Sequence, residues 1–166
     1  MSHAPPAYTC PFCLLAAGKF GPPLLNRASE VIYRDAQVVA FMAAGQFSTR
    51  PGYPGHVLII PARHFENIYV LPDEIAARIQ ALARRVSLAF KHLGCEGTST
   101  RQHNEPAGNQ DVWHDHLHVF PRWAGDNLYH QQRTQPANEV QAHQAAQLKP
   151  YLDAVLRELP LLQIRN

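Results

Sequence analysis

The segment at residues 110–122 constrains the fold of this chain most strongly, because histidines alternate with other residues in QDVWHDHLHVFPR. Successive side chains of a β-strand point to opposite faces. His114, His116 and His118 would therefore share one face, with Leu117 and Val119 on the other. A stripe of histidines that only faced solvent would need no apolar residues behind it. The pattern predicts a half-buried strand whose imidazole row can position a nucleophile, donate hydrogen bonds to a phosphate, or bind a metal ion.

The size and composition of the chain exclude several classes of protein. Its 166 residues fit one domain, and 46% hydrophobic with 17% charged residues is typical of a globular protein. The formal net charge of +2 is too small to favour duplex nucleic acid or an anionic membrane as the main partner. No apolar run approaches the roughly 20 residues of a membrane-spanning helix, and no signal peptide is evident at the start. We expect a cytoplasmic protein.

Hydrophobic periodicity predicts five strands and two helices. The predicted strands cover 31–33, 38–41, 56–60, 97–103 and 112–120, and the predicted helices cover 72–93 and a segment from about 138 onward. Pro150 should kink or split the second helix, and the first 30 residues, rich in Pro and Gly, should form an extended lead-in. This order predicts an α+β fold: a mainly antiparallel sheet of about five strands, one long central helix and a C-terminal helix.

Two of the three cysteines, Cys10 and Cys13, form a Cys-x-x-Cys pair. This spacing supplies half of a tetrahedral zinc site. A redox pair is the alternative, although that motif belongs at a strand-to-helix turn rather than in a lead-in rich in Pro. An inert, reduced pair is the third interpretation. The pair alone does not decide between them.

Residues 110–122 resemble the signature of the histidine triad (HIT) superfamily, whose three histidines alternate with apolar residues. Three further segments match in the expected order. They are CPFC at 10–13, PGHVLIIPARH at 54–64, and HNEPAG at 103–108. Together they cover roughly residues 8–125, which would be the core of a single HIT-like domain at 1–166, with 126–166 as a helical C-terminal extension. The Cys pair is typical of a zinc-bearing branch, and the chain resembles dinucleoside polyphosphate hydrolases.

The resemblance implies a nucleotide hydrolase or nucleotidyl transferase that cleaves at an α-phosphate. The substrate would be a dinucleoside polyphosphate or a related AMP or GMP conjugate, with a phosphoanhydride or phosphoramidate bond. His116 would attack phosphorus and form a covalent nucleotidyl-histidine. The backbone carbonyl of His114 would fix the tautomer of His116. His118 and Gln110 would donate to phosphate oxygens, Asn104 would contact phosphate, and His56 would support the triad.

The resemblance also implies a cofactor and an oligomeric state. In zinc-bearing branches the remaining ligands are the His of the Pro-x-x-His segment and the first triad histidine. The expected site is therefore Cys10, Cys13, His64 and His114, with a structural zinc ion. Family members pair their sheets, so we expect a homodimer.

Three positions depart from the family pattern. Asp115 stands where an apolar residue is usual, and a buried carboxylate would need a partner, for which Arg101 is a candidate. Asp111 replaces a small hydroxyl residue and should turn away from phosphate or pair with an arginine. The segment 42–55 lacks the usual Asp or Asn for ribose hydroxyls, and Ser48 or Gln46 would have to substitute.

Two other functions are compatible with these residues. A non-catalytic nucleotide-binding protein would keep the pocket without turnover. A metal-dependent hydrolase, similar to a cupin, would use His114, His116 and His118 as ligands and would lose activity with a chelator.

Overall fold

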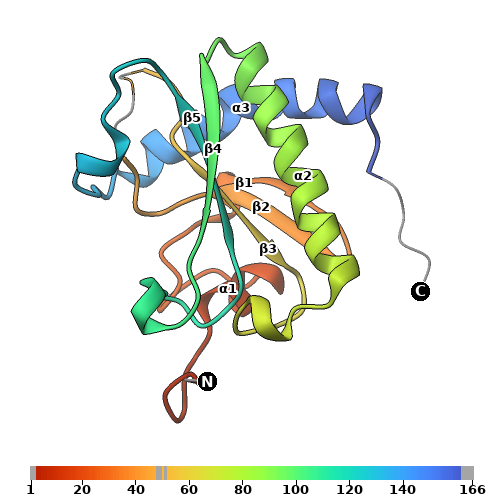
Figure 1. The fold of residues 1–166 in the computed structure, drawn as a ribbon, viewed down its shortest axis with the longest axis vertical. Coiled ribbons are helices and arrows are strands. Elements are labelled where there is room, and N and C mark those ends of the chain that lie inside the picture. Colours follow the sequence, from red (N-terminus) through yellow and green to blue (C-terminus); the bar gives the residue numbers. More distant parts are fainter. Residues whose placement is uncertain (1–2, 48–49, 51, 162–166) are drawn as a thin grey trace.

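A computed structural model describes residues 3–47, 50 and 52–161 (Figure 1). Its centre is a five-stranded sheet of order β1-β2-β3-β5-β4, in which every neighbouring pair is antiparallel. The strands are β1 (Val31–Arg34), β2 (Val38–Met42), β3 (Val57–Pro61), β4 (Gly97–Gln102) and β5 (Leu117–Arg122). The helices are α1 (Pro11–Ala16), α2 (Asp73–His92) and α3 (Asn138–Glu158), with short 3-10 segments η1 (Ala28–Glu30), η2 (Ile68–Val70), η3 (Pro106–Gly108) and η4 (Leu128–His130). The predicted α+β fold is confirmed.

The two faces of the sheet bury different partners, and β3 contributes to both. Val57 and Ile59 belong to the core that α2 and α3 cover, whereas Leu58 and Ile60 belong to a second core under the N-terminal arm, residues 8–26. A strand buried on both faces is apolar throughout rather than alternating, which explains the unbroken aliphatic run in this strand. The functional residues described below lie on the arm face.

Helix α2 forms where the sequence predicts it. Apolar residues at helical spacing, among them Ile79, Val86 and Phe90, are buried against the sheet. Acidic residues occupy the first turn and basic residues the last, which suits the helix dipole. Gly94 follows the C-terminus with a φ of +101°, a conformation that favours glycine. Within the described part of the chain, neither long helix is apolar enough to cross a membrane.

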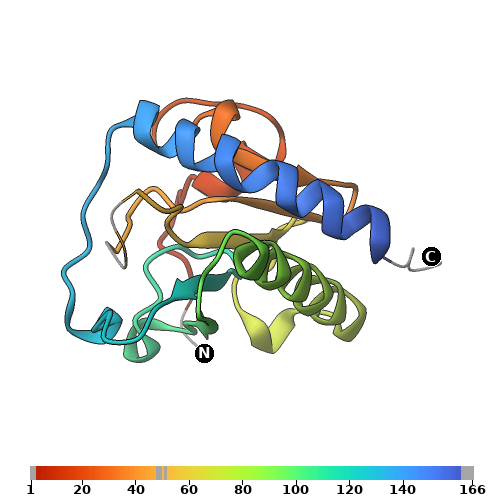
Figure 2. The ribbon, with the colours of Figure 1, turned by 90° about the horizontal axis from the view of Figure 1, so that it is seen from above.

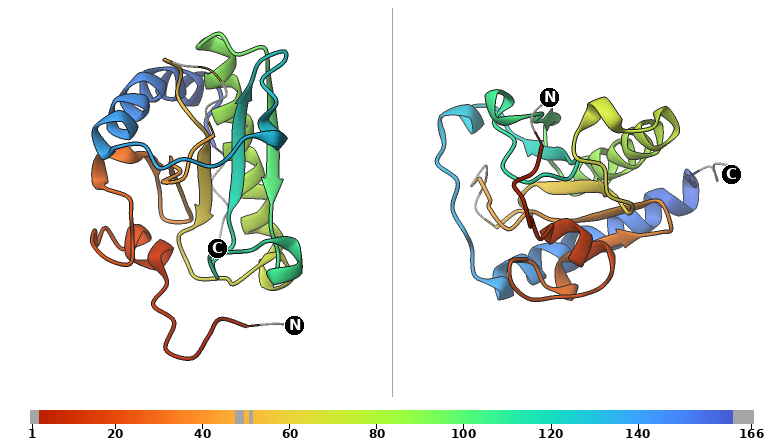
Figure 3. Two further views of the ribbon diagram at one scale, coloured as in Figure 1. Left: turned by 90° about the vertical axis from the view of Figure 1, so that its left-hand side faces the viewer. Right: turned by 90° about the horizontal axis from the view of Figure 1, so that it is seen from below.

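An extended segment, residues 131–137, joins η4 to α3 and is called the strap below. Figure 2 shows it at the left, leading into α3, and Figure 3 (left) shows it crossing in front of the strands. Thr134 of the strap forms two backbone hydrogen bonds with Gln46, of 2.7 and 2.8 Å. The strap is thereby fixed to the loop between β2 and β3.

Three details differ from the sequence-based expectation. The last strand begins at Leu117, not 112, because the Asp115 amide donates to the Phe65 carbonyl and the His114 amide to that of Val112, outside the sheet ladder. Helix α3 is not split at Pro150, since buried leucines on both sides pack it against the core. The lead-in is not wholly extended: Cys10 is the N-cap of α1.

Candidate functional site

A cavity of about 480 Å³ opens on the arm face of the sheet. Its apolar lining comes from the arm, the loop after β2, and β3. Its polar lining comes from His56 just before β3, from β4 and its end, from the triad segment and from the strap. The apolar group includes Phe12, Pro23, Leu24, Leu25, Ala43, Ala44 and Leu58. The polar group includes His56, Arg101, His103, Asn109, Asp111, His116, His118 and Arg133. A concave site of this size, with imidazoles and guanidiniums on one side, can hold an anionic small molecule.

The imidazole of His116 is held in one tautomer. Its Nδ1 donates to the backbone carbonyl of His114 at 2.7 Å, as the resemblance implies, since a carbonyl oxygen can only accept. The other ring nitrogen, Nε2, then carries a free lone pair. Phe12 packs edge-on against the ring, with centroids 5.4 Å apart. Burial lowers the pKa of His116, so the ring is neutral near pH 7 and able to act as a nucleophile.

A stack of rings supports His116. The His118 ring lies 5.1 Å from that of His116, between centroids, and is parallel within 3° to Phe120. His56 stacks on Phe120 at 4.5 Å and on His118 at 5.2 Å. Burial, and next the positive charge of Arg101, lower the pKa of His56 to about 3. Burial likewise lowers the pKa of His118. Both rings therefore enter the site as neutral groups.

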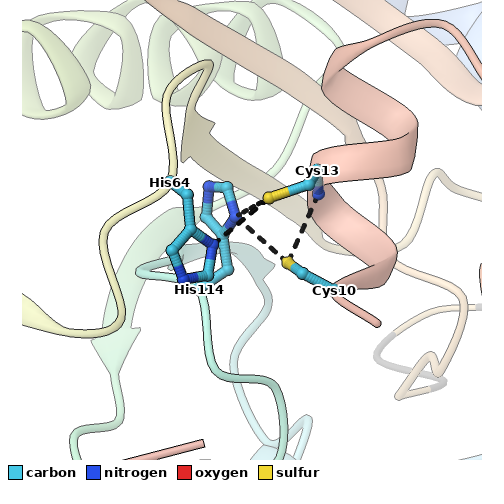
Figure 4. A group of neighbouring side chains, drawn as sticks. All are labelled: Cys10, Cys13, His64 and His114. Carbon is cyan, nitrogen blue, oxygen red and sulfur yellow. Dashed lines mark hydrogen bonds between the residues drawn. The ribbon is translucent and has the colours of Figure 1, made fainter. Parts of the chain in front are cut away.

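The four predicted metal ligands converge at one point (Figure 4). Their donor atoms lie within 4.8 Å of one another. Nδ1 of His114 lies 3.3 Å from the Cys10 sulfur and 3.5 Å from the Cys13 sulfur, and Nδ1 of His64 lies 3.2 Å from the Cys13 sulfur. A tetrahedral zinc ion with usual bond lengths would hold sulfur and nitrogen ligands about 3.6 Å apart. The cluster therefore fits zinc.

The hydrogen bonding of His114 also suits a cation in this cluster. Nε2 of His114 donates to the Pro61 carbonyl at 2.9 Å, which leaves Nδ1 for the metal. Burial, followed by the neighbouring Cys10, raises the pKa of Cys13 to about 12. A bound cation acts in the opposite direction because it stabilises the thiolate.

Two predicted substrate contacts lie beside the cavity rather than in its lining. The side-chain oxygen of Asn104 accepts from the Ile68 amide at 2.9 Å. Gln110 is buried; its side chain accepts from the Glu105 amide at 2.7 Å and donates to the Val112 carbonyl at 3.0 Å. In this structure both side chains shape the loop before the triad.

Two lining residues that sequence reasoning missed come from β4 and its end. Arg101 pairs directly with His118 across β4 and β5, so the two side chains share a face. His103 follows two positions later, and its ring centroid lies 5.7 Å from that of His118. Knowledge of this strand register would have identified both, because the histidine row fixes which face of β5 is functional.

Asp115 and Asp111, which depart from the family pattern, have different partners in the structure. Asp115 is buried, but its partner is the amide of Gln102; the proposed pairing with Arg101 is wrong, because Arg101 lies on the cavity face. Burial raises the pKa of Asp115 to about 6. Asp111 pairs with Arg133 at 3.1 Å, so the expected pairing with an arginine is confirmed.

Gln46 does not take the place of the Asp or Asn that the family usually presents to ribose hydroxyls. Its side chain is buried and bonded to backbone, accepting from the His56 amide at 2.7 Å and donating to the His56 carbonyl at 3.0 Å. Gly55 leaves room for this side chain, since a Cβ there would lie 2.0 Å from the Gln46 oxygen. Ser48, the other candidate, lies outside the described residues.

Comparisons with known proteins agree with this geometry. The HIT domain family matches residues 25–125. Protein hit of Bacillus subtilis is 32% identical over 127 residues, which are 74% of this chain and 77% of that protein. An Arabidopsis thaliana protein named adenylylsulfatase is 27% identical over 126 residues, which are 72% of this chain and 58% of that protein.

A solved structure extends the agreement to the whole fold. A zinc-bound histidine triad family protein from Mycobacterium smegmatis superposes with a TM-score of 0.71 at 25% identity. The alignment covers 90% of this chain and 97% of that one. The matched domain contains the triad, His56 just before β3, and the two histidines of the metal cluster. The chain therefore belongs to the HIT domain family.

Proposed function

We propose that this chain is a nucleotide hydrolase or nucleotidyl transferase that cleaves at the α-phosphate of a nucleotide conjugate. The observation that carries the proposal is the geometry of His116: a neutral ring whose Nδ1 donates to the His114 carbonyl while the ring lines a cavity beside His118. Membership of a family that includes nucleotide hydrolases supports the same chemistry.

The proposed reaction has two displacement steps at phosphorus. In the first, Nε2 of His116 forms a bond to the α-phosphorus and the bond to the leaving group breaks. In the second, water or another acceptor attacks the same phosphorus, loses its proton, and the phosphorus–nitrogen bond breaks to regenerate the imidazole. The His114 carbonyl stabilises the positive charge that develops on His116, and His118 would donate to a phosphate oxygen. Gln110 and Asn104 remain proposed substrate contacts, which would require their loop to rearrange.

Zinc at the Cys10, Cys13, His64 and His114 cluster is proposed to be structural. All four positions are taken by protein ligands, and a closed tetrahedral site leaves no position for substrate. Bound there, zinc would tie the N-terminal arm to the triad segment. Only His114 of the histidine row belongs to a metal-ligand cluster among the described residues, which argues against the alternative of a hydrolase with its metal at the triad.

The substrate class and the oligomeric state are further parts of this proposal. We propose a dinucleoside polyphosphate as the leading substrate, because guanidiniums line the cavity and a relative is named an adenylylsulfatase. We propose a homodimer as well: β4 is at the end of the strand order, so its outer edge is available to a second copy. The cytoplasmic location, and the division into a core at 8–125 and an extension, remain predictions.

The test is release of AMP and GMP from dinucleoside polyphosphates, nucleotide sugars and nucleoside phosphoramidates. Wild type is compared with His116→Ala and with His143→Ala, an exposed histidine of α3. We expect release by wild type and the control, with and without a chelator, and loss by about 10⁴-fold or more in His116→Ala. A nucleotidyl-protein should be trapped from radiolabelled substrate in wild type and in His143→Ala, but not in His116→Ala.

Other outcomes would decide against the proposal. Nucleotide binding without product in any protein would support the non-catalytic alternative. Activity abolished by the chelator in a protein that stays folded, with no nucleotidyl-protein trapped from wild type, would support the metal-dependent hydrolase.

A further inference from the structure

The cavity contains a guanidinium, that of Arg101, with which no carboxylate of the described residues forms an ion pair. Arg101 lies opposite His118 in the sheet, and its guanidinium carbon lies 5.0 Å from the Phe120 ring centroid and 5.4 Å from that of Phe47. Its Nε is buried without a hydrogen-bond partner. Among the described residues no ion pair involves Arg101, whereas Arg122 is paired with Asp126 at 2.7 Å.

An unpaired guanidinium in such a place is costly, because donors removed from water lose their hydrogen bonds. The aromatic faces of Phe47 and Phe120 compensate part of this cost through cation–π contacts. They also hold the planar group in a fixed orientation. Guanidiniums recognise phosphate and similar oxyanions with paired hydrogen bonds, so an oxyanion in the cavity would satisfy the unused donors.

A second cation reaches the same cavity from the strap. The side chain of Arg133 passes close over Gly45, where a Cβ would lie 2.5 Å from its Cδ. Its partner Asp111 is 56% exposed and Arg133 itself 59% exposed, so water weakens this pair and an anion can compete for Arg133. The strap lies outside residues 25–125, which match the family. This cation therefore comes from the part of the chain beyond the matched domain.

The position of Arg101 relative to His116 indicates which part of a substrate it would meet. The His118 ring lies between those of His116 and Phe120 in one row, with centroid distances of 5.1 Å to His116 and 5.7 Å to Phe120. The guanidinium lies beside Phe120, at the far end of this row from His116. A group bound by Arg101 beside Phe120 would therefore be separated from an α-phosphate on His116 by the width of the His118 ring. A substrate that used both would need a second anionic group.

We infer that Arg101, assisted by Arg133, forms an anion subsite for the leaving group, and that this site selects conjugates whose leaving group is itself an oxyanion. This inference rests on the proposed function and specifies its substrate class. Phosphate chains and sulfate share the required chemistry. Conjugates of AMP with a neutral amine lack the second charge, so the subsite would not increase their kcat/KM.

The first test compares two classes of leaving group on one nucleotide. Diadenosine tetraphosphate and adenosine 5′-phosphosulfate supply an oxyanion, and an AMP phosphoramidate of a neutral amine does not. In Arg101→Gln we expect kcat/KM to fall about 10- to 100-fold for the first two and less than about 3-fold for the amine conjugate. Arg84→Gln, at an exposed position on α2, is the matched control and should change neither. A fall for the tetraphosphate alone would identify a phosphate chain as the occupant, and a fall for the phosphosulfate alone would identify sulfate.

An equal fall for all three substrates would overturn the inference while leaving the proposed function intact. If wild type releases no AMP from any conjugate, the proposed function fails, and a binding measurement still decides on the subsite. Inorganic tripolyphosphate is titrated calorimetrically into wild type, Arg101→Gln, Asp111→Asn and Arg84→Gln. We expect about 10-fold weaker binding in Arg101→Gln and tighter binding in Asp111→Asn, which frees Arg133. Equal affinity in wild type and Arg101→Gln would refute the subsite.

Discussion

The clearest quantitative prediction concerns His56, which is 3% exposed and stacks on both His118 and Phe120. Its folded-state pKa is about 3, against an ordinary value of 6.5. Between these values the unfolded chain binds a proton that the folded chain does not. The free energy of unfolding therefore falls as the pH decreases below about 6.5. From pH 7 to pH 5 this one group removes about 2 kcal/mol of stability.

His56→Phe isolates this contribution. Phenylalanine retains the aromatic packing on Phe120 and cannot bind a proton, and the contacts of Gln46 with residue 56 involve only backbone atoms. Urea unfolding of both proteins is followed at pH 7 and pH 5 by the fluorescence of the buried Trp113 and Trp123. The metal cluster is the same in both proteins, so its pH dependence cancels in the comparison. His118 keeps the burial that is the main cause of its lowered pKa.

The expected result is that stability decreases by about 2 kcal/mol less in His56→Phe than in wild type between the two pH values. His143→Phe, which changes an exposed histidine on α3, should match wild type. The same pH dependence in His56→Phe and wild type would mean that His56 binds protons equally when folded and unfolded. That outcome would refute the argument that the site keeps its imidazoles neutral through burial.

Two further predictions concern ion and metal contacts. The hydrogen bonds from Arg122 lower the pKa of the buried Asp126 carboxyl to about 2. Asp126→Asn should therefore reduce the free energy of unfolding by about 2 kcal/mol at pH 7, and urea titrations should show the difference shrink as the pH falls from 4 towards 2. Cys13→Ser should lower the zinc content measured by atomic emission and the Tm in thermal unfolding. A zinc content and Tm equal to those of wild type would contradict the proposed structural metal site.

Local sequence patterns predict much of this fold. Helix α2 could be predicted closely because its apolar spacing and its caps are local signals. The start of β5 could not, because the amide of Asp115 bonds to the carbonyl of Phe65, far away in the sequence. The continuity of α3 across Pro150 likewise depends on tertiary packing, which overrides the low helix propensity of proline.

Some residues of the candidate site can likewise be predicted from local sequence patterns, and others cannot. The histidine row and the Cys pair carry recognisable spacings, and the structure brings all four predicted metal ligands together. Arg101 and Arg133 have no such signal. The first depends on the register between β4 and β5, and the second on the path of the strap across the cavity. The two arginines of the proposed anion subsite are thus harder to predict from the sequence than the histidine row and the Cys pair.

His114 connects the two centres of this molecule. Its side chain contributes to the metal cluster, and its backbone carbonyl orients the ring of His116. Phe12 lies between the two cysteines in sequence and packs edge-on against both imidazoles, at 6.0 Å from His114 and 5.4 Å from His116. A metal that fixes Cys10, Cys13 and His114 would therefore also fix the carbonyl and the aromatic contact that position His116, the proposed nucleophile. Such a metal would help to orient His116 without contacting the substrate, because the protein would fill its four ligand positions.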